Sequence, residues 1–134
     1  MPKQTVNPPE LFDSLQYGFS QMVVSSGGQT VHLSGQVAWD ENQNIVGDGD
    51  LEAQTQQTFK NIDAALKLVG ATLDNVVSMR IYIVAEQMAH SGHVSTALRA
   101  WFSAETAPAT TWIGVHSLAR PEFLIEIEAI AVID

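Results

Sequence analysis

The sequence predicts an α+β fold in which two helices cover one face of a mixed β-sheet. Strand-like segments stand before, between and after two segments whose apolar residues recur with helical spacing. The length of 134 residues suits one hydrophobic core, so we expect a single domain over residues 1–134.

The first part of the chain is predicted to form an arm and a hairpin. Residues 1–16 are polar and proline-bearing, and we expect them to lie over the surface. The apolar runs "MVV" and "TVHLS" then flank the turn-rich "SSGGQ", which predicts a β-hairpin. The next segment, residues 40–50, is dense in Asn, Asp and Gly but lacks the ligand spacing of a calcium loop. We therefore interpret it as a solvated loop.

The clearest helical pattern runs from Asp50 to Gly70. Asp50 is suited to the N-cap position, and Gly70 is suited to the left-handed residue that follows a helix. The apolar positions make one stripe, which consists of Leu51, Thr55, Phe59, Ile62, Leu66 and Val69. This stripe is expected to face the core.

A second helix is expected from about Ala89 to Ser103. Its inward positions are Val94, Leu98 (or Ala97) and Trp101. The segment "ETAPAT" ends this helix, because proline cannot continue it.

Three more strands are predicted, in "NVVSMRIYIVA", "TTWIGVH" and "FLIEIEAIAVI". The first alternates apolar with polar residues, which indicates one solvated face. The last places Glu126 and Glu128 on one face, because strand side chains alternate with a period of two. An unpaired buried carboxylate is costly, so each acid needs water, a partner or a chemical role.

The sheet face opposite the helices is expected to be neither fully apolar nor fully polar. Besides the two acids it carries Tyr82, Trp112 or its neighbours, Ile130 and Val132. A symmetric oligomer that covers this face would resolve the conflict. A carboxylate at such a boundary can be held half-buried for chemistry.

Composition excludes several classes of function. Fifteen acids against six Lys and Arg give a formal charge of -9, which disfavours nucleic-acid binding. The chain has no cysteine, which excludes disulfides, thiolate nucleophiles and Cys–zinc sites. The start lacks the pattern of a signal peptide and no apolar run reaches membrane-spanning length, so we expect a cytoplasmic protein without membrane contact.

Four motifs occur in an order that is similar to a known family. They are "SGQ" at 34–36, the helical segment 50–77, "AP" followed by Ala-Thr, and the terminal "IEIEAIAVI". From about Phe19 to the C-terminus the chain resembles the RidA family, also called YjgF or liver perchloric-acid-soluble protein. The resemblance implies a chorismate-mutase-like fold and a homotrimer whose sheets form a central barrel, with clefts between subunits. It also implies hydrolysis of imines or enamines to 2-oxo acids and ammonia, and some members are endoribonucleases.

The resemblance also implies site residues. Glu126 would be the catalytic acid or base, and the substrate-binding residues would include Phe19, Ser34, Gly35, Ser95 and Thr110. Phe19 stands where the family has tyrosine, and Thr110 stands where the family's "Pro-Ala-Arg" arginine grips the substrate carboxylate. Losing a hydrogen bond to a charged group costs about 1.5–3 kcal/mol. We therefore expect a substrate less anionic than 2-iminopropionate.

Two other bases could replace the missing guanidinium. Arg80 shares the polar strand face with Tyr82, and Arg120 lies in the turn before Glu126. We include Arg120 among the substrate-binding residues, with a surface or interface salt bridge as the alternative for both arginines.

No metal and no cofactor is expected. The four histidines, at 32, 90, 93 and 116, form no H-E-x-x-H motif. Three functions remain open: a deaminase or related C–N hydrolase acting on a small imine or enamine in inter-subunit clefts, a non-catalytic trimer that binds or senses a small molecule, and, as the weakest, an endoribonuclease.

Overall fold

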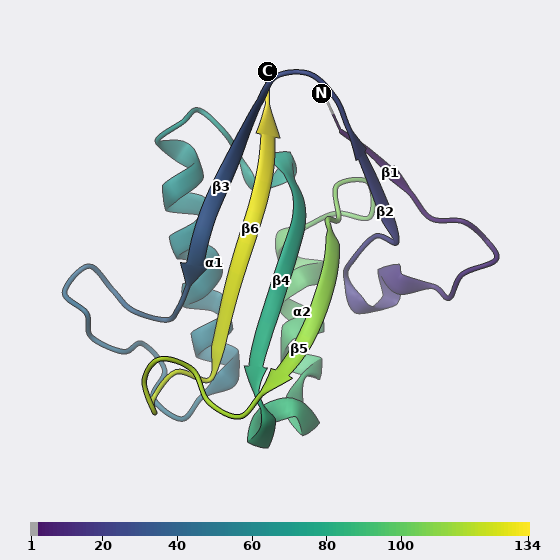
Figure 1. Ribbon diagram of the computed structural model, residues 1–134. Coiled ribbons are helices and arrows are strands. Elements are labelled where there is room, and N and C mark those ends of the chain that lie inside the picture. The colour runs from purple at the N-terminus through teal and green to yellow at the C-terminus, as the bar shows by residue number, and fades with distance from the viewer. Residues whose placement is uncertain (1–2) are drawn as a thin grey trace.

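Four strands form the main sheet of the computed structural model, which describes residues 3–134. The strand order is β3 (Gln29–Gln36), β6 (Ile125–Ile133), β4 (Val76–Val84) and β5 (Ala109–Val115), as Figure 1 shows. β6 runs antiparallel to both of its neighbours, whereas β4 and β5 are parallel. The mixed sheet confirms the predicted α+β class.

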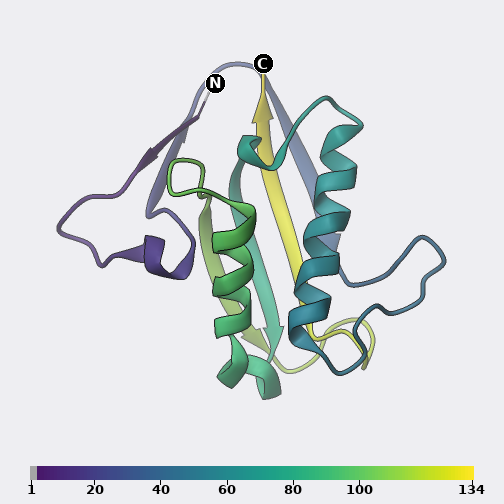
Figure 2. The same cartoon turned by 180° about the vertical axis from the view of Figure 1, so that it is seen from behind.

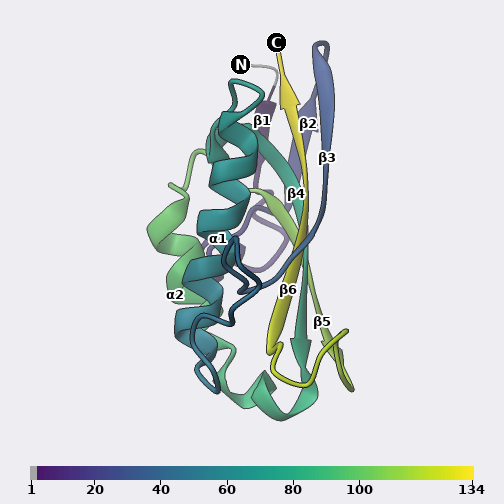
Figure 3. The same ribbon diagram turned by 90° about the vertical axis from the view of Figure 1, so that its left-hand side faces the viewer.

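Two helices cover one face of this sheet and leave the other free. α1 (Leu51–Lys67) and α2 (Gly92–Trp101) lie side by side in front of the strands in Figure 2, and the side view in Figure 3 separates the two layers. The core between the layers includes the fully buried residues Phe59, Ile62, Leu66, Met79, Ile81, Ile83, Leu98, Ile125 and Ile127. Within the described residues, no helix is long and apolar enough to cross a membrane.

The boundaries of α1 follow the predicted signals. Asp50 caps the helix, because its Oδ1 accepts a hydrogen bond from the Ala53 N–H at 3.1 Å. Gly70 has φ +73° beyond the helix end, as expected for the left-handed position. Val69, however, is 47% exposed, so its place in the buried stripe was wrong. The helix ends at Lys67, and the helical spacing no longer applies to Val69.

The second helix is shorter than predicted. Residues Ala85–His90 form a separate 3₁₀ segment, η3, so α2 begins only at Gly92. Its buried positions include Val94 and both Ala97 and Leu98.

The predicted hairpin is wrong, and the predicted arm contains a strand; residues 1–2 of that arm lie outside the described residues. β1 (Lys3–Val6) pairs with β2 (Met22–Ser25) in a separate two-stranded sheet, and the short 3₁₀ segment η1 (Ser14–Tyr17) lies between them in the chain. β3 pairs instead with β6, on the far side of the main sheet from this ribbon (Figure 1). A Cβ on Gly28 would lie 1.8 Å from the Ile133 carbonyl oxygen, so the turn-rich segment is used to pass close over the end of β6.

The strand register decides which side chains occupy the free face. Tyr82 pairs with Glu126 and Arg80 pairs with Glu128, so all four share that face. On β5 it is Thr111 and Ile113, the neighbours of Trp112, that lie beside Arg80 and Tyr82. Trp112 itself is on the helix side. A further 3₁₀ segment, η2 (Leu73–Asn75), leads into β4.

Candidate functional site

Gly35 lies directly against the carboxylate of Glu126. The β3–β6 register shifts between Leu33 and Gln36, so Ser34 and Gly35 form a bulge opposite β6. A Cβ on Gly35 would lie 2.0 Å from Glu126 Oε2, which leaves room only for glycine while the carboxylate keeps this position. The bulge thus brings two of the predicted site residues into contact.

The two acids of β6 have opposite electrostatic environments. Burial raises the pKa of Glu126, and repulsion from the neighbouring Glu128 raises it further. The Tyr82 hydroxyl donates to Glu128 Oε1 at 2.6 Å, which lowers the pKa of Glu128 and raises that of Tyr82. Arg80 Nη1 lies 3.4 Å from the same oxygen. We call Gly35, Tyr82, Glu126 and Glu128 the acid cluster.

This difference matters for chemistry because Glu126 is the acid that more readily holds a proton, while Glu128 is held ionised. Two neighbouring carboxyl groups with pKa values pushed apart are a common arrangement for acid–base catalysis. Next to the acid cluster, the free face is hollowed by a cavity of about 510 Å³, lined in part by Arg80, Thr111 and Glu128.

A second group of predicted residues gathers at the β5 edge. The Trp112 Nε1–H donates to Thr110 Oγ1 at 3.0 Å, and the Phe19 ring lies 6.3 Å from the Trp112 ring. A pocket of about 310 Å³ is lined by Tyr17, Phe19, Ser91, Gly92, Ser95 and Trp112. We call this the aromatic pocket.

One protomer does not bring the acid cluster and the aromatic pocket together. Gly35 is on β3 and Thr110 is on β5, the two opposite edges of the sheet. Glu126 pairs with Tyr82, whose neighbour on β5 is Ile113, three positions beyond Thr110. The Thr110 hydroxyl bonds Trp112 on the helix side of the sheet, although Thr110 also lines the cavity beside Glu128. The predicted cleft lies between subunits, and within one chain Glu126 with Gly35 and Phe19 with Ser95 belong to two separate groups.

The two arginines considered as replacements are placed differently. Arg120 stacks over Trp39, with its guanidinium carbon 5.3 Å from the ring centroid. It lines another hollow, with Glu86 and His116, that includes neither Glu126 nor Thr110. Arg80 lies beside the acid cluster through Glu128.

Sequence reasoning missed two residues that shape these groups. Trp112 was considered for the free face, and its bond to Thr110 across one strand face was not foreseen. The two-residue spacing of Thr110 and Trp112 could have indicated this contact, because residues i and i+2 of a strand share a face. The Tyr82–Glu128 hydrogen bond had no such signal, because cross-strand register is not visible in the chain.

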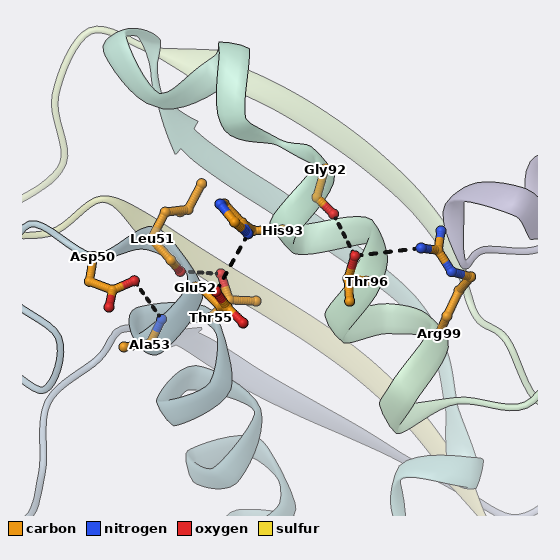
Figure 4. Close-up of polar contacts among 9 residues, drawn as sticks. All are labelled: Asp50, Leu51, Glu52, Ala53, Thr55, Gly92, His93, Thr96 and Arg99. Atoms are coloured by element: carbon orange, nitrogen blue, oxygen red, sulfur yellow. Dashed lines mark hydrogen bonds and ion pairs between the residues drawn. The ribbon is translucent and has the colours of Figure 1, made fainter.

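The histidine pair near α2 lies apart from both groups. His93 Nδ1 is 3.7 Å from Glu52 Oε2, near the starts of the two helices, as Figure 4 shows beside the Asp50 cap. Among residues 3–134, no group of three or more His, Cys, Asp or Glu is placed to hold a metal ion. We interpret His93–Glu52 as a surface pair.

The comparisons with known proteins agree with the fold. Residues 14–133 match the family model described as endoribonuclease L-PSP. A RutC family protein of Pyrococcus horikoshii is 30% identical over 84% of this chain and 85% of that protein. A protein of Dermatophagoides farinae named 2-iminobutanoate/2-iminopropanoate deaminase is 30% identical over 80% of each chain.

A solved structure gives the same result. The Yersinia pestis protein YyfB, described as a protein of unknown function of the conserved Rid protein family, has a TM-score of 0.94 and 40% identity. The match covers 99% of this chain and all of that one. With a family match that spans 14–133, this chain belongs to the endoribonuclease L-PSP family, which includes the RidA and YjgF proteins, and the predicted resemblance is confirmed.

Proposed function

We propose that this protein hydrolyses the C–N bond of a small imine or enamine, with Glu126 as the acid–base catalyst. The observation that carries the proposal is the half-buried Glu126 carboxylate, held against Gly35 with a raised pKa. A carboxyl group is most useful for proton transfer when its pKa approaches the working pH. The relative named as an iminobutanoate and iminopropanoate deaminase supports the reaction class.

In the proposed reaction, Glu126 gives up one proton and regains one, so it is unchanged at the end. The Glu126 carboxyl group donates a proton to the imine nitrogen, and the resulting carboxylate takes a proton from the attacking water. The carbinolamine that forms loses ammonia and leaves a carbonyl product, so one water is consumed for each C–N bond broken. The Gly35 bulge supports this step by leaving space for the carboxylate, because glycine has no side chain at that position.

The active assembly in this proposal is a homotrimer. The acid cluster of one subunit would face the aromatic pocket of the next, because one protomer keeps the two groups apart and Gly35 and Thr110 lie at opposite edges of its sheet. Phe19, Ser34, Ser95 and Thr110 would then bind substrate beside Glu126. Arg120, which stacks on Trp39, is the weakest member of the predicted set. Light scattering coupled to size-exclusion chromatography tests the assembly, and a monomer at all concentrations would contradict it.

The activity is tested with two imines generated in the cuvette by amine oxidation: the anionic 2-iminopropionate and the uncharged benzaldimine. Glu126→Gln should reduce the accelerated loss of imine by about 10²–10⁴-fold. Glu122→Gln, which changes an acid in the turn before β6, is the matched control and should retain the rate. Equal rates for both variants would exclude Glu126 as the catalyst.

The same assay separates catalysis from binding. A non-catalytic binding protein would bind the amine or carbonyl partner without accelerating loss of either imine. Thr110→Arg introduces the arginine that binds the substrate carboxylate in the family. We expect it to increase activity on 2-iminopropionate more than on benzaldimine. RNA cleavage has less support, because the formal charge of -9 opposes binding of a polyanion.

A further inference from the structure

We propose that the aromatic pocket selects an uncharged planar group of the substrate, and that Thr110 is the positioning residue that shapes it. Thr110 stands where the family has an arginine, and here its hydroxyl has a structural contact of its own. It holds the Trp112 indole in place through the Nε1–H···Oγ1 hydrogen bond of 3.0 Å. This inference rests on the proposed function only in treating the pocket as the substrate-holding part of the same cleft.

The chemistry of the pocket wall supports an uncharged group. Its six lining residues include three aromatic rings and two serines, and none carries a charge at neutral pH. A carboxylate there would lose part of its hydration without gaining a cationic partner from the lining. The formal charge of -9 adds a long-range field that opposes an anion.

The volume and shape fit a small planar ligand. The pocket holds about 310 Å³, near the lower end of the range for small-molecule sites. The Phe19 and Trp112 rings are inclined at 51°, so they form two sides of a wedge rather than a closed stack. Offset or edge contacts with a planar ligand are favourable in such a wedge.

The polar side of the pocket suits a carbonyl oxygen. Ser91 and Gly92 lie at the start of α2, and Ser95, only 7% exposed, is one turn further along. Hydroxyl groups and the positive end of the helix dipole favour a partial negative charge on a ligand atom. They cannot neutralise a full carboxylate as a guanidinium does.

The remaining wall is held rigidly against α2. Gly18 has φ +96°, and a Cβ there would lie 2.5 Å from Leu98 Cβ, so the backbone between Tyr17 and Phe19 packs close to the helix. Arg99 Nη1 also donates to the Gln16 carbonyl oxygen and ties this segment to α2. The indole of Trp112 packs against the core, and its N–H makes a side-chain hydrogen bond to Thr110.

The test uses three probes of one shape and different charge: benzamide, benzoate and benzamidine. The Trp112 indole N–H signal in ¹H–¹⁵N spectra of the full chain reports binding, and single Trp→Phe variants assign it among the three tryptophans. We expect saturable binding of benzamide at least about tenfold tighter than that of benzoate. Equal or tighter benzoate binding, or no saturable benzamide binding, overturns the proposal. Benzamidine about tenfold tighter than benzamide would also overturn it, since the pocket would then select a cation.

Variants at β5 test the role of Thr110 as a positioning residue. Thr110→Val removes the acceptor with little change in shape, and should shift the Trp112 N–H signal and weaken benzamide binding about 2–10-fold. Thr110→Ser keeps the hydroxyl and should restore both. Thr111→Val, on the opposite strand face, is the matched control and should change neither. Unchanged Trp39 and Trp101 signals report that Thr110→Val is folded, and an unchanged Trp112 signal in that variant overturns the positioning role.

The proposed selectivity of the pocket and the proposed reaction can be contradicted by different results. If Glu126→Gln leaves imine loss unchanged while benzamide still binds in preference to benzoate, the proposed reaction is wrong and the pocket's selectivity stands. If the imines are hydrolysed through Glu126 but benzoate binds as well as benzamide, the reaction stands and this inference is wrong.

Discussion

The acid cluster lies on the main sheet, whereas the aromatic pocket is formed largely by α2 and the segment around Phe19, and the two differ in how they are stabilised. In the acid cluster, Glu126 is half-buried against Gly35, and its pKa is raised by burial and by Glu128. In the aromatic pocket, ionisable carboxylates and bases are absent from the lining, and the wall is set by packed rings and one hydrogen bond between Trp112 and Thr110.

The difference teaches that the charged groups lie on the central strands of the sheet, whereas the uncharged pocket is built against its β5 edge. In the acid cluster, the bulge of β3 leaves space for the Glu126 carboxylate. Glu128, on β6, supplies the nearby charge that helps to raise the pKa of Glu126. The aromatic pocket instead offers packed rings and serine hydroxyls, with no charged side chain in its lining. The two regions can therefore be perturbed independently, and each prediction below changes one side of this comparison.

The largest effect is expected at the anchor of β6. Gln54 is fully buried, and its amide N–H groups donate to the carbonyl oxygens of Gly47 and Glu122 at 3.0 and 2.9 Å. Its Oε1 accepts from the Leu124 N–H at 2.9 Å, directly before the strand that carries Glu126. Gln54→Leu leaves these groups unpaired and should lower the free energy of unfolding by about 2–4 kcal/mol in urea titrations.

The matched control lies on the same helix. Gln57 donates to Asn61 Oδ1 at 2.9 Å, and Gln57→Leu should cost less than about 1 kcal/mol. Similar losses for the two variants would show that Gln54 does not anchor the acid cluster.

The next effect is expected at the bulge. Gly35→Ala places a methyl group where Glu126 Oε2 now lies, so the carboxylate must move or the bulge must shift. We expect a loss of about 1–3 kcal/mol in unfolding free energy, together with loss of imine hydrolysis. Gly92→Ala, at a position with no atom within 4 Å of the added Cβ, should change stability by less than about 1 kcal/mol. A fully active Gly35→Ala variant would separate Gly35 from the chemistry.

A smaller effect, distinguished by its sign, is expected from pH. The pKa of Glu126 is raised above 4.5, so the folded state binds more protons and stability falls as pH rises through the window above 4.5. The pKa of Glu128 is lowered below 4.5, so its contribution is present above 4.5 and is lost as pH falls through the lowered value. Glu126→Gln should therefore stabilise the protein at neutral pH relative to wild type, and Glu128→Gln should destabilise it. Unfolding measured from pH 3 to 8 checks both signs, and the same sign for the two variants would contradict the assignment.

The smallest effect is expected for Arg80. Its Nη1 lies 3.4 Å from Glu128 Oε1, and its side chain is 65% exposed. Arg80→Ala should cost less than about 1 kcal/mol, and the loss should shrink further in salt. A loss larger than that of Tyr82→Phe would mean that the ion pair, and not the tyrosine hydroxyl, holds Glu128 in place.

Much of the fold could be predicted because it depends on local periodicity. The apolar spacing of α1 and the alternation in β4 identify buried faces without knowledge of any partner. The predicted hairpin was wrong because Gly27 and Gly28 indicate a turn but not which strands will pair on either side of it. Lys3 anchors β1, the partner of β2, because its Nζ donates to the carbonyl oxygens of Asp74, Val76 and Thr106 at 3.0, 2.6 and 2.6 Å.

The candidate site divides in the same way. Placing Glu126 and Glu128 on one strand face needed only the period of two, and the sequence was sufficient for that. The unequal pKa values of the two acids needed the register of β4 against β6, which delivers the Tyr82 hydroxyl to Glu128 and not to Glu126.

By itself, then, the sequence determined the α+β class, the family, the N-cap of α1, and the pairing of acids on the terminal strand, because each follows from short-range spacing or from motif order. Only the tertiary structure decided where β2 goes, that Gly35 meets Glu126, and that Thr110 bonds Trp112 beside Phe19. Those contacts join segments far apart in the chain, and their geometry is set by strand register and packing, which no local pattern encodes.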